Sequence, residues 1–283
     1  VDYTIERHYP QIKSSKTKAL DLLNLVMEKQ CQLVVDWMRV GFIHGVMNTD
    51  NMTISGETID YGPCAFMDQY HPKTVFSSID KLGRYAYSNQ PPITKWNLTR
   101  FAECLIPLID KNEDTAIKIA TNVIDNFQNI YEKKWLNMMR DKLGLFGEDK
   151  NDRKLIDDLL NWMEKNKIDY TNIFCHLMDI KIDNNTYKDK TFLTWFDEWK
   201  KRSQLNNSSK EKQIELMKKN NPIVVPRNHK VEEALTEANN GSLEGMNKLN
   251  DILKNPYSNQ EDIAEYQVPA PTTNEKYQTF CGT

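Results

Sequence analysis

Three polar side chains, Asp50, Asn51 and Asp60, lie at the two ends of a short β-prone stretch. Two β-prone runs, 52–54 and 58–59, are separated by a Ser-Gly-Glu turn, and this pattern predicts a tight hairpin. Asn51 precedes the first strand and Asp60 ends the second, so antiparallel pairing should bring them within roughly 5 Å of each other. Their oxygen atoms are hard ligands of the kind that suits Mg²⁺, with Mn²⁺ as the alternative. The same cation could bridge the oxygens of the ATP phosphates, which predicts phosphate-transfer chemistry.

The segment before the hairpin reads HGVMNTDN over 44–51, with His44 seven positions before Asn51. Kinase-like catalytic loops have this layout: a His, an Asn seven positions on, a hairpin, and then Asp-Phe-Gly. Ordinary kinase loops place the catalytic base two positions after the His, but Val46 occupies that place and cannot take a proton. Either the site is inactive, or Asp50 supplies the carboxylate from another direction. The second reading would suit a reaction in which a different phosphorus atom faces the acceptor.

Each of these residues also has a plainer interpretation. Asp50, Asn51 and Asp60 could simply be turn formers, because Asp and Asn favour such positions. His44 is expected to hold the shape of the loop by hydrogen bonding and not to act as a base. Arg84 could contact phosphate or hold its own loop, and we favour the second role.

The elements that must position these residues are mostly helices. An apolar stripe at helical spacing predicts a long helix over 17–40, directly before the loop. A stretch rich in Pro, Gly, Ser and Asp over 61–92 predicts a long ordered loop after the hairpin. Helical patterns then return over 96–110, 114–143, 153–165, 172–179 and 191–205, and more weakly over 210–219, 230–238 and 243–253.

Composition bounds the class of protein. The 283 residues are 39% hydrophobic and 27% charged, the balance of a soluble globular chain of one large or two small domains. The net charge of −3 offers no basic field for nucleic acid or an anionic membrane, and no apolar run is long enough to span a bilayer. The chain opens without a secretory signal, and its five scattered cysteines form no C-x-x-C pair. We therefore expect free thiols in a reducing cytoplasm.

Several motifs in one order resemble the selenoprotein O (YdiU) family. They include HGVMNTDN at 44–51, IDYGP at 59–63, GRYA at 83–86, NQP at 89–91, WNL at 96–98, PRNH at 226–229, VEEAL at 231–235 and YQTFC at 277–281. The resemblance runs from about residue 7 to the last residue. A set of this size is far more specific than any single short motif.

The resemblance implies a mainly α (α+β) fold: a protein-kinase-like C-lobe portion over 1–110, and a helical C-terminal extension over 111–283. It implies a pseudokinase that transfers AMP from ATP to Ser, Thr or Tyr hydroxyls of proteins. In this chain Asp50 would be the general base, Asn51 and Asp60 the Mg²⁺ ligands, and Asp60 a further nucleotide contact. We expect a bacterial cytoplasmic monomer with ATP and protein substrates as partners, and no nucleic acid or membrane.

The family's glycine-rich loop and ATP-binding Lys precede these motifs, and the chain holds no G-x-G-x-x-G. It also starts without Met, so we expect a C-terminal fragment that is inactive without the N-terminal lobe. Two other functions stay open: ordinary phosphotransfer, which the loop layout permits and Val46 disfavours, and a non-catalytic helical binding module after Lys111.

Two further groups of residues have alternative roles. Cys281 matches the position where eukaryotic family members carry selenocysteine. The resemblance allows a bridge to a cysteine near the site, for which Cys64 is the nearest candidate, but a free tail thiol is the favoured reading. Arg227, Asn228 and His229 could reach the site, but we favour Asn228 as the cap of a helix that begins near His229.

Overall fold

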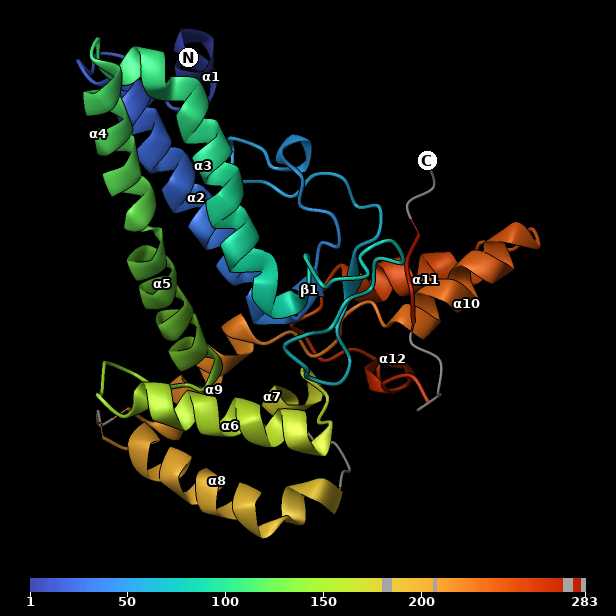
Figure 1. Cartoon of the computed structure of the whole chain (residues 1–283). Coiled ribbons are helices and arrows are strands. Elements are labelled where there is room, and N and C mark those ends of the chain that lie inside the picture. Colours follow the sequence, from blue (N-terminus) through green and yellow to red (C-terminus); the bar gives the residue numbers. More distant parts are fainter. Residues whose placement is uncertain (180–184, 206–207, 272–276, 281–283) are drawn as a thin grey trace.

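The computed structural model describes residues 1–179, 185–205, 208–271 and 277–280, and in these residues the chain is mainly helical, as predicted (Figure 1). One small antiparallel sheet joins β1 (Phe42–Ile43) to β2 (Ala65–Phe66), with Phe42 opposite Phe66 and Ile43 opposite Ala65. The α-helices are α1 (Asp2–His8), α2 (Lys18–Val40), α3 (Gln90–Ile109), α4 (Glu113–Asp125), α5 (Phe127–Lys142), α6 (Asp152–Asn166), α7 (Asn172–Leu177), α8 (Lys190–Ser203), α9 (Lys210–Asn220), α10 (Asn228–Asn239), α11 (Glu244–Leu253) and α12 (Ala264–Gln267). Short 3-10 turns cover Pro10–Ile12, Thr49–Asn51, Tyr87–Asn89 and Asn185–Lys188.

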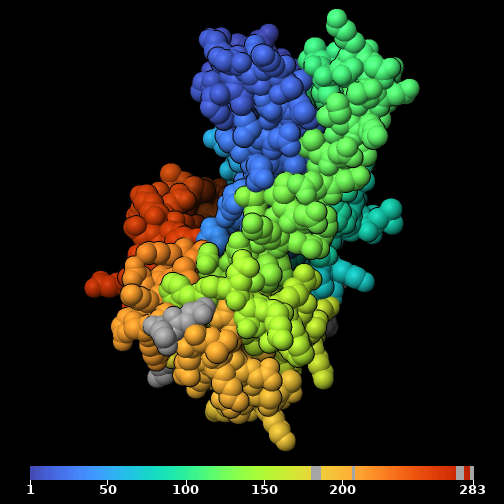
Figure 2. Space-filling model, turned by 90° about the vertical axis from the view of Figure 1, so that its left-hand side faces the viewer, coloured from blue at the N-terminus to red at the C-terminus, as the bar shows by residue number. Residues whose placement is uncertain are grey.

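Helices α2 to α5 form one elongated part of the molecule. α3 and α5 both pack on α2, and α4 packs on α3 (Figure 1). Across the far end of α5 lie α6 and α8, while α10 and α11 pair with each other beside the irregular segment that follows β1. The side view in Figure 2 shows this long shape, with α1 and α4 at one end and α8 at the other.

Two buried hydrophobic clusters stabilise this arrangement. The first surrounds the C-terminal half of α2, the two strands and helices α5 to α8, and the second joins α1, the N-terminal half of α2, α3 and α4. Met52 packs against the first cluster and Ile54 against the second. The predicted site hairpin therefore packs against both hydrophobic clusters.

Helix α2 ends where the site begins because of a glycine. Gly41 has φ 74°, the left-handed conformation that commonly follows a helix C-terminus, and its N–H bonds back to Met38. A Cβ at this position would lie 3.1 Å from the ring of Tyr170. The chain can therefore turn sharply from α2 into β1, which leads directly into the site loop, residues 44–51.

The predicted helices are confirmed with shifts at their boundaries. The helix predicted over 96–110 begins earlier, at Gln90, because Pro91 and Pro92 lie in its first turn, where a proline costs no hydrogen bond. The stretch predicted as one helix over 114–143 is two helices that meet at Asn126. Helices α1 and α12 and the β1–β2 pair were not predicted. The division of the chain at residue 110 stays a prediction.

A buried lysine joins the end of α5 to the end of α2. Lys142 is 2% exposed, its Nζ donates to the Arg39 carbonyl at 2.8 Å, and it lies 3.8 Å from the centre of the Phe174 ring. Burial, with a smaller contribution from the charge of Arg39, holds the pKa of Lys142 well below its ordinary value. In the unfolded chain this amine takes up a proton below pH ~10.4, so the unfolded state binds more protons than the native state in the window just below that pH.

We predict that Lys142→Met flattens the pH dependence of stability. In wild-type protein this group makes the free energy of unfolding rise with pH, by up to about 1.4 kcal/mol per pH unit. Urea denaturation at several pH values between 7 and 10 measures the difference in slope between the two proteins. Lys118→Met, on the exposed face of α4, is the control and should keep the wild-type slope. Equal slopes for Lys142→Met and wild type would show that the buried amine is protonated in the native state.

Candidate active site

The β1–β2 pair closes the segment between Ile43 and Ala65 into one loop that carries all the predicted site residues. Within it, the predicted hairpin is present as a single antiparallel bridge between Met52 and Thr58, with a turn in which Gly56 donates to the Thr53 carbonyl. Asn51 directly precedes this bridge, and Asp60 lies two residues after it. The two side chains therefore come from the same end of the site hairpin, residues 51–60.

His44 connects the two arms of this loop from inside. Its ring is fully buried, and Nε2 lies 2.9 Å from the Ile59 carbonyl oxygen, directly before Asp60. A carbonyl can only accept, so the Nε2–H tautomer donates, which leaves Nδ1 to accept the Val46 N–H at 3.4 Å. Burial lowers the pKa of His44, which keeps the ring neutral at pH 7. The predicted structural role of His44 is confirmed.

A second close approach explains the glycine beside this histidine. Gly45 has φ 86°, and a Cβ there would lie 2.5 Å from the Pro63 carbonyl oxygen. Any other residue would separate the site loop from the segment that follows Asp60. His44 and Gly45 together therefore hold the two arms of the loop against each other.

The N-terminal end of α3 supports the site loop from below with buried polar side chains. Gln90 accepts from the His44 backbone N–H at 3.0 Å and donates to the Phe42 carbonyl at 3.0 Å. About two helical turns later, Asn97 donates to the Met47 carbonyl at 2.9 Å. The sequence pattern did not predict this role of Gln90 and Asn97. The available signal was two amide side chains seven residues apart on one helix face, among apolar neighbours.

The three predicted site residues differ in how they are held. Asp50 lies in the 3-10 turn Thr49–Asn51, and its side chain is exposed. Asn51 is half-buried and donates its Nδ2 to the Val46 carbonyl at 3.0 Å, so its Oδ1 remains as a ligand atom. Asp60 is exposed at φ 57°, a left-handed conformation that Asp tolerates, and its Oδ1 accepts the Gly62 N–H at 3.2 Å.

The oxygen donors of Asn51 and Asp60 suit a cation that is also coordinated by phosphate oxygens and water. In the part of the chain that the structure describes, no three His, Cys, Asp or Glu side chains are grouped to hold a metal by themselves. Asn51 and Asp60 offer one amide and one carboxylate oxygen at an exposed hairpin end. Mg²⁺ is held in this way when phosphate oxygens and water complete its six ligands.

Comparison with known proteins settles the family. A family model described as protein adenylyltransferase SelO matches residues 1–254. A protein nucleotidyltransferase YdiU of Pelagibacter ubique is 66% identical over the whole chain. The YdiU proteins of Nitrosococcus oceani and Bacillus cereus are 49% and 51% identical, again over the whole chain. This chain belongs to the SelO family. It spans 59% of the length of the Pelagibacter protein and 58% of the other two.

Three other residues from the SelO motifs, Arg84, Arg227 and Asn228, contact other parts of the protein and are not grouped with Asp50, Asn51 and Asp60. The guanidinium of Arg84 lies 5.0 Å from the centre of the Trp96 ring, on the surface beside α3. Arg227 is buried, where it pairs with Asp68 and Asp169, each at 2.7 Å. The prediction that Asn228 caps a helix is wrong by one residue. Arg227 is the N-cap residue, while the Asn228 side chain donates to the Phe66 carbonyl because the loop after β2 packs against this helix end.

Cys281, and with it the choice between a free tail thiol and a Cys64–Cys281 bridge, lies outside the described residues. Cys64 is half-buried with a free thiol that donates to the Tyr61 carbonyl. Nearby, the Thr279 hydroxyl donates to the Pro63 carbonyl at 2.7 Å, and its backbone pairs with the segment around Ser77. The C-terminal tail of this SelO chain therefore passes close to the site.

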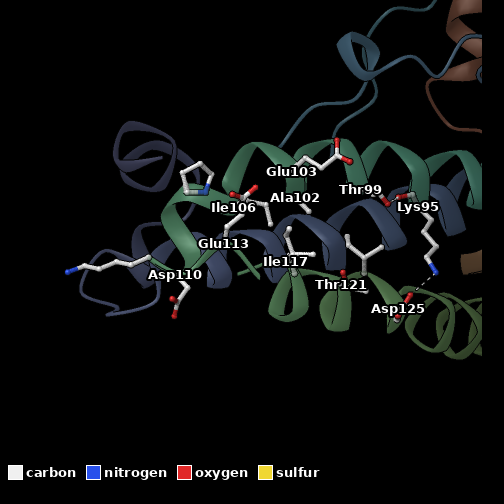
Figure 3. A pocket seen from close by; sticks show the side chains of 14 residues that line it. Lys95, Thr99, Ala102, Glu103, Ile106, Asp110, Glu113, Ile117, Thr121 and Asp125 are labelled. Atoms are coloured by element: carbon white, nitrogen blue, oxygen red, sulfur yellow. Dashed lines mark hydrogen bonds and ion pairs between the residues drawn. The ribbon is translucent and has the colours of Figure 1, made fainter. Parts of the chain in front are cut away.

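A wide groove elsewhere on the molecule does not coincide with the candidate site. It has a volume of about 890 Å³ and lies between α3 and α4, where Lys95 and Asp125 form an ion pair at 3.6 Å (Figure 3). Figure 3 shows its lining side chains, and Asp50, Asn51 and Asp60 are not among them.

None of the helices in the described residues has both the length and the apolar character needed to cross a membrane.

We predict that His44→Ala destabilises the protein by about 2–4 kcal/mol, because it removes two hydrogen bonds and leaves a cavity beside Trp37 and Phe42. Urea denaturation at pH 7.5 measures this loss. His71→Ala is the matched control, since that ring is exposed and should cost at most about 0.5 kcal/mol. If both variants were equally stable, His44 would not hold the loop as described.

Proposed function

We propose that this chain is the C-terminal catalytic part of a protein adenylyltransferase, built on a kinase-like C-lobe. It would transfer AMP from ATP to Ser, Thr or Tyr hydroxyls of proteins in the bacterial cytoplasm, acting as a monomer. The observation that carries the proposal is that Asn51 and Asp60 lie at one end of the site hairpin with the exposed Asp50 beside them. The names of the YdiU relatives support the reaction class.

In the proposed reaction Asn51 Oδ1 and the Asp60 carboxylate hold Mg²⁺, or Mn²⁺ in its place, against the phosphates of ATP. When bound, the cation neutralises phosphate charge that would otherwise repel the incoming hydroxyl oxygen. Asp50 orients the hydroxyl and takes its proton. The hydroxyl oxygen forms a bond to the α-phosphorus, the bond from that phosphorus to the β-bridging oxygen breaks, and pyrophosphate leaves. Catalysis of this type depends mainly on positioning and charge stabilisation.

The absence of a carboxylate at Val46 supports AMP transfer over ordinary phosphotransfer. A base at that position would face an acceptor placed for the γ-phosphorus, as in kinases. In this chain the carboxylate of the site loop is four residues further on, at Asp50, next to the metal ligand Asn51. A shifted base suits a nucleotide whose α-phosphorus faces the acceptor.

We predict that in the full-length protein Asp60→Ala abolishes transfer and Asp50→Ala reduces it by about 10²-fold or more, as expected for loss of a metal ligand and of a general base. Incorporation of label from α-labelled ATP into a protein acceptor measures the rate. Asp197→Ala, on the exposed face of α8, is the control and should keep wild-type activity. Full activity of either site variant would refute the assignment of that residue.

The same assay separates the two transfer reactions. AMP transfer carries label from α-labelled ATP into the acceptor and none from γ-labelled ATP, whereas phosphotransfer does the reverse. The mass of the modified acceptor gives an independent answer, since an adenylyl group is much heavier than a phosphoryl group. A phosphoryl adduct would replace the proposed function by the kinase alternative.

We also predict that the isolated chain binds ATP and Mg²⁺ weakly or not at all, because the family's phosphate-clamping residues belong to the N-terminal lobe. Isothermal titration calorimetry of this chain against the full-length protein tests this. Tight binding by the isolated chain would mean that the N-terminal lobe is not essential for nucleotide binding. Absence of binding by both proteins would favour the non-catalytic binding module.

A further inference from the structure

The C-terminal tail contacts the segment that follows Asp60. This segment, the exit arm (residues 61–64), joins the site hairpin to β2. The Thr279 hydroxyl donates to the Pro63 carbonyl oxygen at 2.7 Å, and both residues are buried. The same carbonyl lies so close to Gly45 that a Cβ there would be 2.5 Å from its oxygen. The Pro63 carbonyl is therefore enclosed between the site loop and the tail.

Thr279 is itself held in place by its neighbours. Its backbone N–H donates to the Phe76 carbonyl at 2.8 Å, and its carbonyl accepts the Ser78 N–H at 2.9 Å, which makes a parallel bridge. Two residues earlier, Tyr277 packs edge-on against the Phe76 ring and donates its hydroxyl to Glu232 of α10 at 2.8 Å. Alternate residues of the tail face inward, as in a strand that lies on a surface. The tail therefore presents the Thr279 hydroxyl from a fixed position.

Asp60 lies between two such supports. His44 holds the residue before it, and Thr279 holds Pro63, three residues after it. The Asp60 carboxylate is exposed, and its Oδ1 accepts the N–H of Gly62, which belongs to the exit arm and directly precedes Pro63. A shift of the exit arm would therefore move the carboxylate.

We propose that Thr279 is a positioning residue for Asp60: through the Pro63 carbonyl it fixes the exit arm, and with it the carboxylate that would bind the cation. Its role in catalysis rests on the proposed function, whereas the contact itself can be tested without nucleotide or metal. Without the hydroxyl, the buried Pro63 carbonyl would lose its donor, so the exit arm would open to reach water. Cation binding would then weaken, because one of its two protein ligands would no longer be preorganised.

Cys64 reports on the state of the exit arm. Its half-buried thiol donates to the Tyr61 carbonyl, and burial raises the pKa of this thiol, so it should react slowly. Thr279→Val removes the hydroxyl with little change in shape, and Thr279→Ser keeps it. We expect iodoacetamide to label Cys64 about fivefold faster in Thr279→Val than in wild type, the value of about one net hydrogen bond, and at the wild-type rate in Thr279→Ser.

The labelling uses metal-free full-length protein that carries Cys281→Ser, so that no bridge to Cys281 can contribute. Mass spectrometry of peptides gives the rate at each cysteine. Thr194→Val is the matched control, because it removes a hydroxyl-to-carbonyl hydrogen bond on the exposed face of α8, and it should leave the Cys64 rate unchanged.

The other cysteines show whether the effect is local. The exposed Cys104 should react equally fast in all variants, and the buried Cys31 and Cys175 should stay protected. Faster labelling of Cys31 and Cys175 together with Cys64 would show a general loss of stability and would overturn the proposal. An unchanged Cys64 rate in Thr279→Val would overturn it as well.

The AMP-transfer assay tests the consequence for the cation. Thr279→Val should raise the Mg²⁺ concentration needed for the half-maximal rate about fivefold, and Thr279→Ser should restore the wild-type value. A mere loss of folded protein would lower the rate without moving this midpoint, and that result would contradict the proposal. If wild-type protein transferred no AMP, the proposed function would fail, and the Cys64 rates alone would decide whether Thr279 holds the exit arm.

Discussion

The buried imidazole of His44 is the contact on which the candidate site depends. Its Nε2–H holds the Ile59 carbonyl, and its Nδ1 accepts from Val46, so one ring fixes the start of the site loop and the residue before Asp60. Apart from the 3-10 turn Thr49–Asn51, the two arms contain no helix or strand, and a single bridge joins the two sides of the site hairpin. Without this ring the separation of Asn51 and Asp60 would be set by a hairpin too short to be stable alone.

Helices α2 and α3 position the site loop. α2 delivers the chain to the site through the left-handed turn at Gly41, and α3 supports the loop with Gln90 and Asn97. Helix α5 contacts the end of α2, just before this turn, through Lys142, which donates to the Arg39 carbonyl. A helix that the family resemblance assigns to a C-terminal extension therefore supports the helix that leads into the site.

Helix α2 and the turn of the site hairpin could be predicted from sequence, because each depends on a pattern of neighbouring residues in the chain. The apolar stripe before Gly41 predicts α2 to within one residue, and the β-prone runs around Gly56 predict the turn of the site hairpin. The supporting contacts could not be predicted, because they join residues far apart in the chain. Nothing local in Gln90 or Asn97 indicates a bond to the site loop, and the pairing of Phe42 with Phe66 depends on tertiary packing around two very short strands. The early start of α3 was hidden by prolines that sequence rules associate with loops as often as with helix starts.

In the proposed site, Asn51 and Asp60 share one divalent cation beside Asp50. Anomalous X-ray diffraction from crystals of the full-length protein with Mn²⁺ and a non-hydrolysable ATP analogue tests this arrangement most directly. We expect a single strong anomalous peak at the end of the site hairpin, about 2.1 Å from Asn51 Oδ1 and from an Asp60 carboxylate oxygen. A nucleotide-bound Mn²⁺ peak held by other residues, with Asn51 and Asp60 turned away from it, would refute the shared cation site.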